Sequence, residues 1–128
     1  MKKYRIELSE EQIMLIARCL EDVSRFASGQ LEMRYTIEEI VKELPFDEQI
    51  ERRKLAEEHL NQVKRVLLPE MPDNGSKGYN GNDFIGNTYT IYRTILHQIA
   101  IDYDWNNVYS SPALPSGNMG IIKIETLT

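Results

Sequence analysis

The chain has 128 residues, of which 41% are hydrophobic and 27% are charged, and its formal net charge at pH 7 is −5. This length predicts a single domain over residues 1–128, large enough to form a core without crosslinks. The only cysteine, Cys19, excludes an intramolecular disulfide and a cysteine-rich zinc site, and the negative charge argues against nucleic-acid polymers and anionic membranes as partners.

The N-terminal part of the chain predicts a strand followed by a helix. Residues 3–8 alternate apolar and polar side chains, as a half-buried strand does. Ser9 and Gln12 match a capping box, so a helix is expected from about residue 10 to 27, with Gly29 as its terminator. The side chain of Cys19, in this helix, is expected to be buried and to serve for packing. Apolar residues at spacings of three and four predict its buried face: Ile13, Ile16, Leu20, Val23 and Ala27.

Three more helices and a second strand are predicted further along. Thr36 with Glu39 matches a capping box and predicts a short helix that Pro45 ends. Asp47 is expected to cap a long, highly charged helix, and the last helix is expected over about residues 85–103. Residues 71–87, with four glycines and four asparagines, predict a loop. Residues 121–127 alternate and predict a strand.

The predicted fold class is therefore α+β. The domain is expected to be mostly helical, with two long helices and a shorter one. Because isolated strands are marginal, the N- and C-terminal strands are expected to pair in a small antiparallel sheet. The wide apolar arc of the first helix has more surface than one neighbour can cover, which favours an oligomer.

Residues typical of catalysis are sparse in this sequence. The two histidines, His59 and His97, lie in different predicted helices and in no metal-binding spacing, so no metal and no cofactor are expected. His59 is expected to be exposed. The glycine-rich loop lacks the spacing of a phosphate-binding Walker motif. The sequence thus favours a protein that is not an enzyme.

Other residues favour recognition of an anionic ligand that contains a base. Arg18 and Arg25 lie two turns apart on the first helix, either as ligands or in surface ion pairs with Asp22. Arg93 has no carboxylate three or four residues away, which favours a phosphate ligand. Phe84, like Tyr79, has an aromatic face that either stacks on a base or anchors the loop.

Four segments resemble one family of phage-encoded proteins. They are KYRIELSEEQIMLIARCLED at residues 3–22, RFASGQL at 25–31, NTYTIYRTILH at 87–97 and NVYSSP at 107–112. These segments are similar to the first family of Thoeris anti-defence proteins, which are non-enzymatic sponges for cyclic ADP-ribose isomers. Some members also bind cyclic trinucleotides. Residues 32–80 carry no such resemblance.

The resemblance implies a helical protein with a small sheet, assembled as dimers into a hexamer. It implies ligand pockets between subunits, where aromatic side chains hold the base and arginines hold the pyrophosphate. Serine hydroxyls or backbone groups act as further donors. The positions that match the family segments, or that lie close to them, are the candidate ligand-binding residues: Arg18, Arg25, Phe84, Asn87, Arg93, Ser110 and Ser111.

The expected function is that of an anti-defence sponge in the cytoplasm of the host cell. It would bind a cyclic nucleotide signal, a cyclic ADP-ribose isomer or a cyclic oligonucleotide, and leave it uncleaved. Two alternatives stay open. One is a small phosphodiesterase with His97 as general acid or base and Arg93 on the phosphate. The other is a protein inhibitor whose acidic long helix docks on a basic partner.

Overall fold

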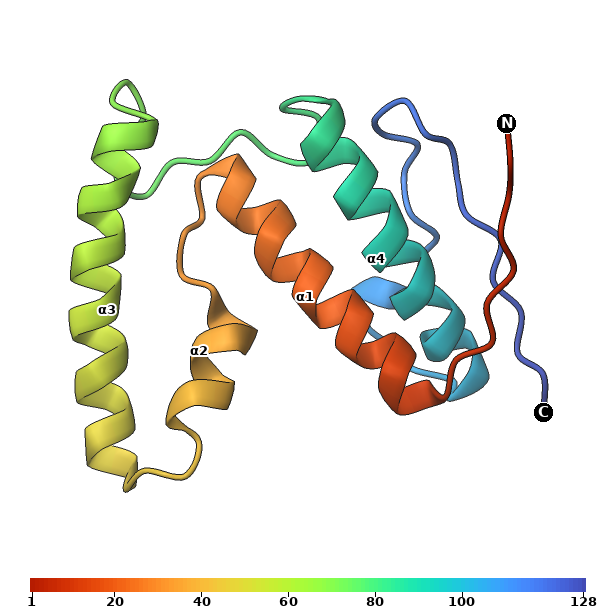
Figure 1. Cartoon of the computed structure of the whole chain (residues 1–128), viewed down its shortest axis with the longest axis horizontal. Coiled ribbons are helices and arrows are strands. Elements are labelled where there is room, and N and C mark those ends of the chain that lie inside the picture. The colour runs from red at the N-terminus through yellow and green to blue at the C-terminus, as the bar shows by residue number, and fades with distance from the viewer.

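The computed structural model describes residues 1–128 as a row of helices without any strand. The elements are α1 (Glu10–Ser28), α2 (Arg34–Val41), α3 (Phe46–Leu67), α4 (Asp83–Asp102) and the short 3₁₀-helix η1 (Val108–Ser110). α1 lies between α4 and α2, and α3 packs against α2 at the outer edge (Figure 1). None of the helices is both long and apolar enough to cross a membrane.

The core lies between α1 and α4. Its buried members are Ala17, Tyr92, Ile95, Leu96 and Ile99. The C-terminal segment adds Ile122 and Ile124, which pack against this cluster from outside the helices. α3 carries few buried side chains, so the half of the molecule formed by α2 and α3 is held together by little apolar contact.

The α+β prediction is wrong, because the chain ends form no sheet. Residues 3–8 and 121–127 are extended, but no backbone hydrogen bond joins them. In the C-terminal segment, the alternation serves instead to place Ile122 and Ile124 on the helical core. In the N-terminal segment, Tyr4 and Ile6 stay exposed. Period-two patterning indicates one-sided burial, and it needs a hydrogen-bonded neighbour before it makes a strand.

The predicted ends of α1 are confirmed, whereas its predicted buried face is confirmed only in part: Ile13 and Leu20 pack against the core, but Ile16 and Val23 are exposed. The Ser9 hydroxyl accepts a hydrogen bond from the Gln12 backbone amide, and the Gln12 side chain accepts one from the Ser9 backbone amide. Gly29 ends the helix with a φ of 109°. The fully buried residues, however, lie on the polar side of the helix: Ala17, Glu21, Asp22, Ser24 and Ser28. Cys19, expected inside, is exposed. The side of α1 that faces the protein thus combines apolar residues with buried polar and charged ones.

α2 begins differently from the sequence prediction. It starts at Arg34 after Met33, and Thr36 lies within it rather than capping it. The N-terminal amides are satisfied from α1: Asp22 Oδ2 accepts from Thr36 N and Thr36 Oγ1, each at 2.7 Å, and Asp22 Oδ1 accepts from Tyr35 N at 3.2 Å. A buried carboxylate from a neighbouring helix therefore replaces the local capping box.

The starts of α3 and α4 depend on the residues just before them. α3 begins directly after Pro45, and Asp47, the predicted cap, lies within its first turn. Asn82 caps α4, because its side-chain oxygen accepts from the Ile85 amide at 2.8 Å. Both helices start two residues before the predicted positions.

Candidate anion-binding site

The polar side of α1 forms a buried charge cluster with α2 and α4. Glu21, with 0% of its side chain exposed, receives two arginines from its own helix. Arg25 Nη2 lies 2.8 Å from Glu21 Oε2, and Arg18 Nη1 lies 3.4 Å from Glu21 Oε1. Tyr35 of α2 donates to the same carboxylate at 3.5 Å, and the Arg18 guanidinium lies over its ring. The predicted ion pairs with Asp22 are therefore replaced by pairs with Glu21.

The pKa directions in this cluster follow from burial and from Glu21. Burial opposes the charge of Arg25, but the Glu21 carboxylate and the nearby phenols of Tyr92, Tyr35 and Tyr109 outweigh it, so the pKa of Arg25 is raised. Burial and then Glu21 raise the pKa of Tyr35. The same two causes raise the pKa of Tyr92 to about 12. The cluster therefore favours charged guanidinium groups beside neutral phenols.

Arg93 is a buried cation without an acidic partner. Only 8% of the residue is exposed. Its Nη2 donates to the carbonyls of Val108 at 3.1 Å and Ser111 at 3.4 Å, and the guanidinium carbon lies 5.0 Å from the centre of the Tyr109 ring. Its Nη1 is buried and has no hydrogen-bond partner. This arrangement leaves a positive charge and a donor group free for an anion.

Tyr109 connects the two groups of arginines. Its ring covers Arg93 on one side of the site. Its phenol is also close enough to Arg25, Tyr35 and Tyr92 to affect their pKa values. Arg18 and Arg25 pair with Glu21, whereas Arg93, on the other side of Tyr109, contacts no carboxylate.

His97 and Asn87 are occupied in fixing the chain beside this region. The Nδ1 atom of His97 lies 2.9 Å from the Tyr109 carbonyl, which can only accept, so Nδ1 carries the proton. Asn87 Oδ1 accepts from the amides of Asn118 and Met119, and its Nδ2 donates to Asn118 Oδ1. Asn87 therefore holds the C-terminal loop on α4 through both its side-chain oxygen and its side-chain nitrogen.

The remaining predicted residues do not join the arginine cluster as ligands. Phe84 is 55% exposed at the start of α4, and at about 100° per residue it lies on the opposite side of that helix from Arg93. Ser110 Oγ donates to the Trp105 carbonyl at 2.6 Å. Ser111 contributes its carbonyl to Arg93. Within one chain, Phe84 therefore cannot stack on a base whose phosphate lies at Arg93.

Four residues of the cluster were not predicted from the sequence: Glu21, Tyr35, Tyr92 and Tyr109. Tyr92 is also a member of the core cluster, so its position on α4 is compatible with an apolar packing role alone. The signal that could have found Glu21 is its position three residues after Arg18 and four before Arg25, which allows both ion pairs.

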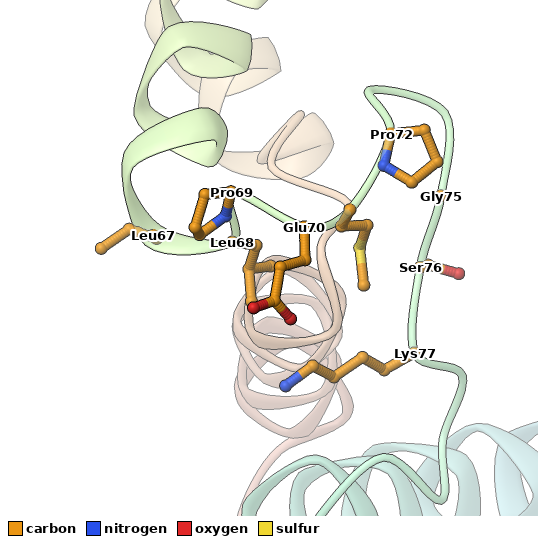
Figure 2. A pocket seen from close by; sticks show the side chains of 9 residues that line it. Leu67, Leu68, Pro69, Glu70, Pro72, Gly75, Ser76 and Lys77 are labelled. Carbon is orange, nitrogen blue, oxygen red and sulfur yellow. The ribbon is translucent and has the colours of Figure 1, made fainter.

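A surface hollow of about 540 Å³ lies away from this cluster, in the loop after α3. The loop is anchored by Lys64, whose Nζ donates to the carbonyls of Asp73 and Gly75 at 2.7 Å each. Glu70 and Lys77 extend into the hollow from opposite sides, while Ser76 points away from it (Figure 2). The hollow shares no residue with the arginine cluster, so the unpaired charge of Arg93, rather than this volume, locates the candidate site.

The chain was compared with known families, sequences and structures. No family model, curated protein or solved structure matches it. The structure also brings no three His, Cys, Asp or Glu side chains together in a group that could hold a metal ion. The candidate site is thus defined by the geometry of the arginines and tyrosines alone.

The raised pKa of Tyr92 predicts a loss of stability at alkaline pH. Because the folded phenol ionises near 12 and the unfolded phenol near 10, its contribution is complete below pH 10 and is lost as the pH rises toward 12. We expect the free energy of unfolding to fall by about 2 to 3 kcal/mol across this range. Urea unfolding at a series of pH values measures it.

Tyr92→Phe provides the control for this titration. The variant lacks the ionisable group, so its unfolding free energy should decline less steeply above pH 10 than that of the wild type. Parallel curves for the two proteins would contradict the assignment of the effect to Tyr92.

Proposed function

We propose that the protein binds and sequesters a cyclic nucleotide signal of anti-phage defence, a cyclic ADP-ribose isomer or a cyclic oligonucleotide, without cleaving it. The observation that carries the proposal is Arg93, a buried guanidinium that bonds only to backbone carbonyls and leaves Nη1 unpaired. An unpaired buried donor on a cation is costly, and a phosphate oxygen would satisfy both the charge and the donor.

The neighbouring residues support a ligand with more than one charge. The side chains of Arg18 and Arg25 remain 31% and 40% exposed although both contact Glu21. Each therefore keeps N–H groups that face solvent, and a pyrophosphate can accept from them. Tyr109 supplies a ring face that already lies on a guanidinium and is suited to the edge of a ligand site.

Access to Arg93 requires a movement of the segment that carries η1. Nη1 is closed off from solvent, and Val108 and Ser111 hold the guanidinium through single carbonyl contacts of 3.1 and 3.4 Å. A phosphate that replaces these carbonyls gives the guanidinium a negatively charged acceptor in place of neutral ones. We therefore expect residues 108–111 to shift when the ligand binds.

The proposal includes a homo-oligomer, dimers that assemble into a hexamer, in the cytoplasm of the host cell. The family resemblance is its basis, together with the position of Phe84 on the side of α4 opposite Arg93. A base held by Phe84 and a phosphate held by Arg93 can belong to one ligand if the two residues come from different copies.

A non-enzymatic role fits the surroundings of His97. The imidazole donates from Nδ1 to the Tyr109 carbonyl, and no carboxylate among the hydrogen-bond partners supports it as a base. A phosphodiesterase that relied on His97 would need a second group to activate water or to protonate the leaving oxygen. The cluster offers guanidinium groups and neutral phenols instead.

Calorimetry on the purified full-length chain tests the proposal. Cyclic ADP-ribose isomers and cyclic trinucleotides are titrated separately, and the bound probe is released by heat denaturation and analysed by mass spectrometry. Sequestration at signalling concentrations predicts a dissociation constant near the nanomolar range, about −12 kcal/mol. The recovered probe should have the mass of the probe added.

The alternatives give different results in the same experiment. A cleaved product whose formation His97→Ala abolishes would replace sequestration by phosphodiesterase activity. Absence of binding to every cyclic nucleotide, with salt-sensitive capture of a basic protein, would instead favour the protein inhibitor.

A further inference from the structure

The hollow after α3 has a shape that its own loop maintains. Lys64 is only 2% exposed, and its Nζ donates to the carbonyls of Asp73 and Gly75 at 2.7 Å each. The Gly75 amide in turn donates to the Pro72 carbonyl at 2.9 Å. Pro69 and Pro72 restrict the backbone of the same loop. The hollow of about 540 Å³ is therefore preformed, and its volume lies within the range of small-molecule sites.

The loop that forms the hollow is also fastened to the end of α1. The Lys77 amide donates to the Ser28 carbonyl at 2.7 Å. Gly29, which ends α1, lets the loop lie this close, because a Cβ there would be 2.6 Å from Met71 Sδ. The hollow thus lies at the C-terminal end of a helix of 19 residues, where the partial charge of the helix dipole is negative and favours a cation.

Two side chains of opposite charge face each other across the hollow. Glu70 and Lys77 extend into it from opposite sides (Figure 2). Neither side chain has an ion-pair partner in the chain, whereas Arg65 and Asp73 beside them pair with each other at 2.6 Å. The hollow therefore presents one free carboxylate and one free ammonium group to a molecule that enters between them.

The wall between these two charges is rich in carbon. Ser76 points away from the hollow (Figure 2), so its hydroxyl adds no polar group to the interior. The side chains that supply the apolar surface are Leu67, Leu68, Pro69, Met71 and Pro72. A ligand can therefore bury an apolar body against this wall while its charged ends meet Glu70 and Lys77.

We propose that this hollow is a binding site for a free amino acid with an apolar side chain. The ammonium group of the ligand lies at Glu70 and at the C-terminal end of α1, its carboxylate lies at Lys77, and its side chain packs on the apolar wall. A molecule with both charges satisfies both partners. An anion or a cation alone satisfies only one of them and is repelled by the other, so the pair of charges selects a zwitterion.

This site is separate from the one on which the proposed function rests. It shares no residue with the arginine cluster, and every test below is made on the full chain without nucleotide. A chain that binds nucleotide but no amino acid would refute only the inference made here. A chain that binds an amino acid but no nucleotide would refute only the proposed function.

The first test compares three probes by saturation-transfer NMR. L-leucine carries both charges, L-leucinamide lacks the carboxylate, and N-acetyl-L-leucine lacks the ammonium group. We expect L-leucine to bind with a dissociation constant about 5- to 10-fold lower than that of either derivative, because each derivative leaves one charged side chain of the site unpaired. Absence of saturable binding of L-leucine, or equal binding of all three probes, would overturn the inference.

The second test removes the charges of the site one at a time. Lys77→Gln should abolish the preference for L-leucine over L-leucinamide, and Glu70→Gln should abolish the preference for L-leucine over N-acetyl-L-leucine. Both side chains are exposed, so neither substitution disturbs the core. Lys54→Gln, at an exposed position of α3, is the matched control and should keep both preferences. If both preferences survived in Lys77→Gln and Glu70→Gln, the amino acid would bind elsewhere and the assignment of the hollow would be wrong.

Discussion

Arg93→Gln should weaken the binding of a cyclic ADP-ribose isomer by about 10- to 150-fold relative to the wild type, as loss of one hydrogen bond to a charged group implies. Arg93 is the guanidinium with the fewest competing partners, because it contacts no carboxylate and its Nη1 bonds to nothing. Arg93→Lys keeps the charge but loses the planar pair of donors, so its affinity should lie between that of the wild type and that of Arg93→Gln. Calorimetry at one ionic strength measures all three proteins.

The control for this experiment is Arg65→Gln. Arg65 lies in the last turn of α3 and forms a surface ion pair at 2.6 Å with Asp73 of the following loop, outside the arginine cluster. Its substitution should leave the affinity unchanged. If Arg93→Gln bound the isomer as tightly as the wild type while keeping its fold by circular dichroism, Arg93 would not be a ligand. An equal loss in both variants would indicate a nonspecific effect of charge.

Asp22→Ala should lower the free energy of unfolding by about 2 to 4 kcal/mol. The Asp22 carboxylate accepts three hydrogen bonds from the first turn of α2, two of them at 2.7 Å. Its removal leaves two backbone amides of that turn without an acceptor and removes one of the polar links between α1 and α2. Because α3 packs on α2, the backbone amides of both helices should become less protected from hydrogen exchange with solvent. Urea unfolding gives the free energy.

Asp47→Ala is the matched control for Asp22→Ala. Asp47 also lies near a helix start, in the first turn of α3, but it is exposed and bonds to no backbone amide there. Its substitution should change the free energy of unfolding by less than about 0.5 kcal/mol. Equal effects of the two substitutions would show that Asp22 contributes only its charge and not its hydrogen bonds.

The local signals in the sequence predicted where the helices lie better than they predicted how the helices contact one another. Ser9, Gln12 and Gly29 act through neighbouring backbone atoms, so their effect on α1 is readable from the chain. The predicted start of α2 was wrong because the side chain that caps it, Asp22, comes from another helix. The prediction of two strands was wrong because alternation of apolar and polar residues does not reveal whether a hydrogen-bonded neighbour exists.

The candidate site was predictable only in part, for the same reason. The absence of acid near Arg93 was readable from spacing, and the structure confirms that no carboxylate contacts it. Its carbonyl partners in residues 108–111 depend on how the chain folds back on α4. The apolar arc of α1 was correctly recognised, but the direction in which it faces depends on Glu21 and its partners.

The charge of the cluster has a consequence for how a ligand arrives. Arg18, Arg25, Arg93 and Glu21 together carry a net positive charge, whereas the whole chain carries −5. At low salt, where the screening length is about 30 Å, an approaching anion is therefore repelled by the net charge of the whole chain, whereas at a screening length of about 8–10 Å it responds mainly to the nearby arginines. Added salt should accelerate the encounter of a small anion with this surface, and long polyanions, whose charges extend past the cluster, are turned away.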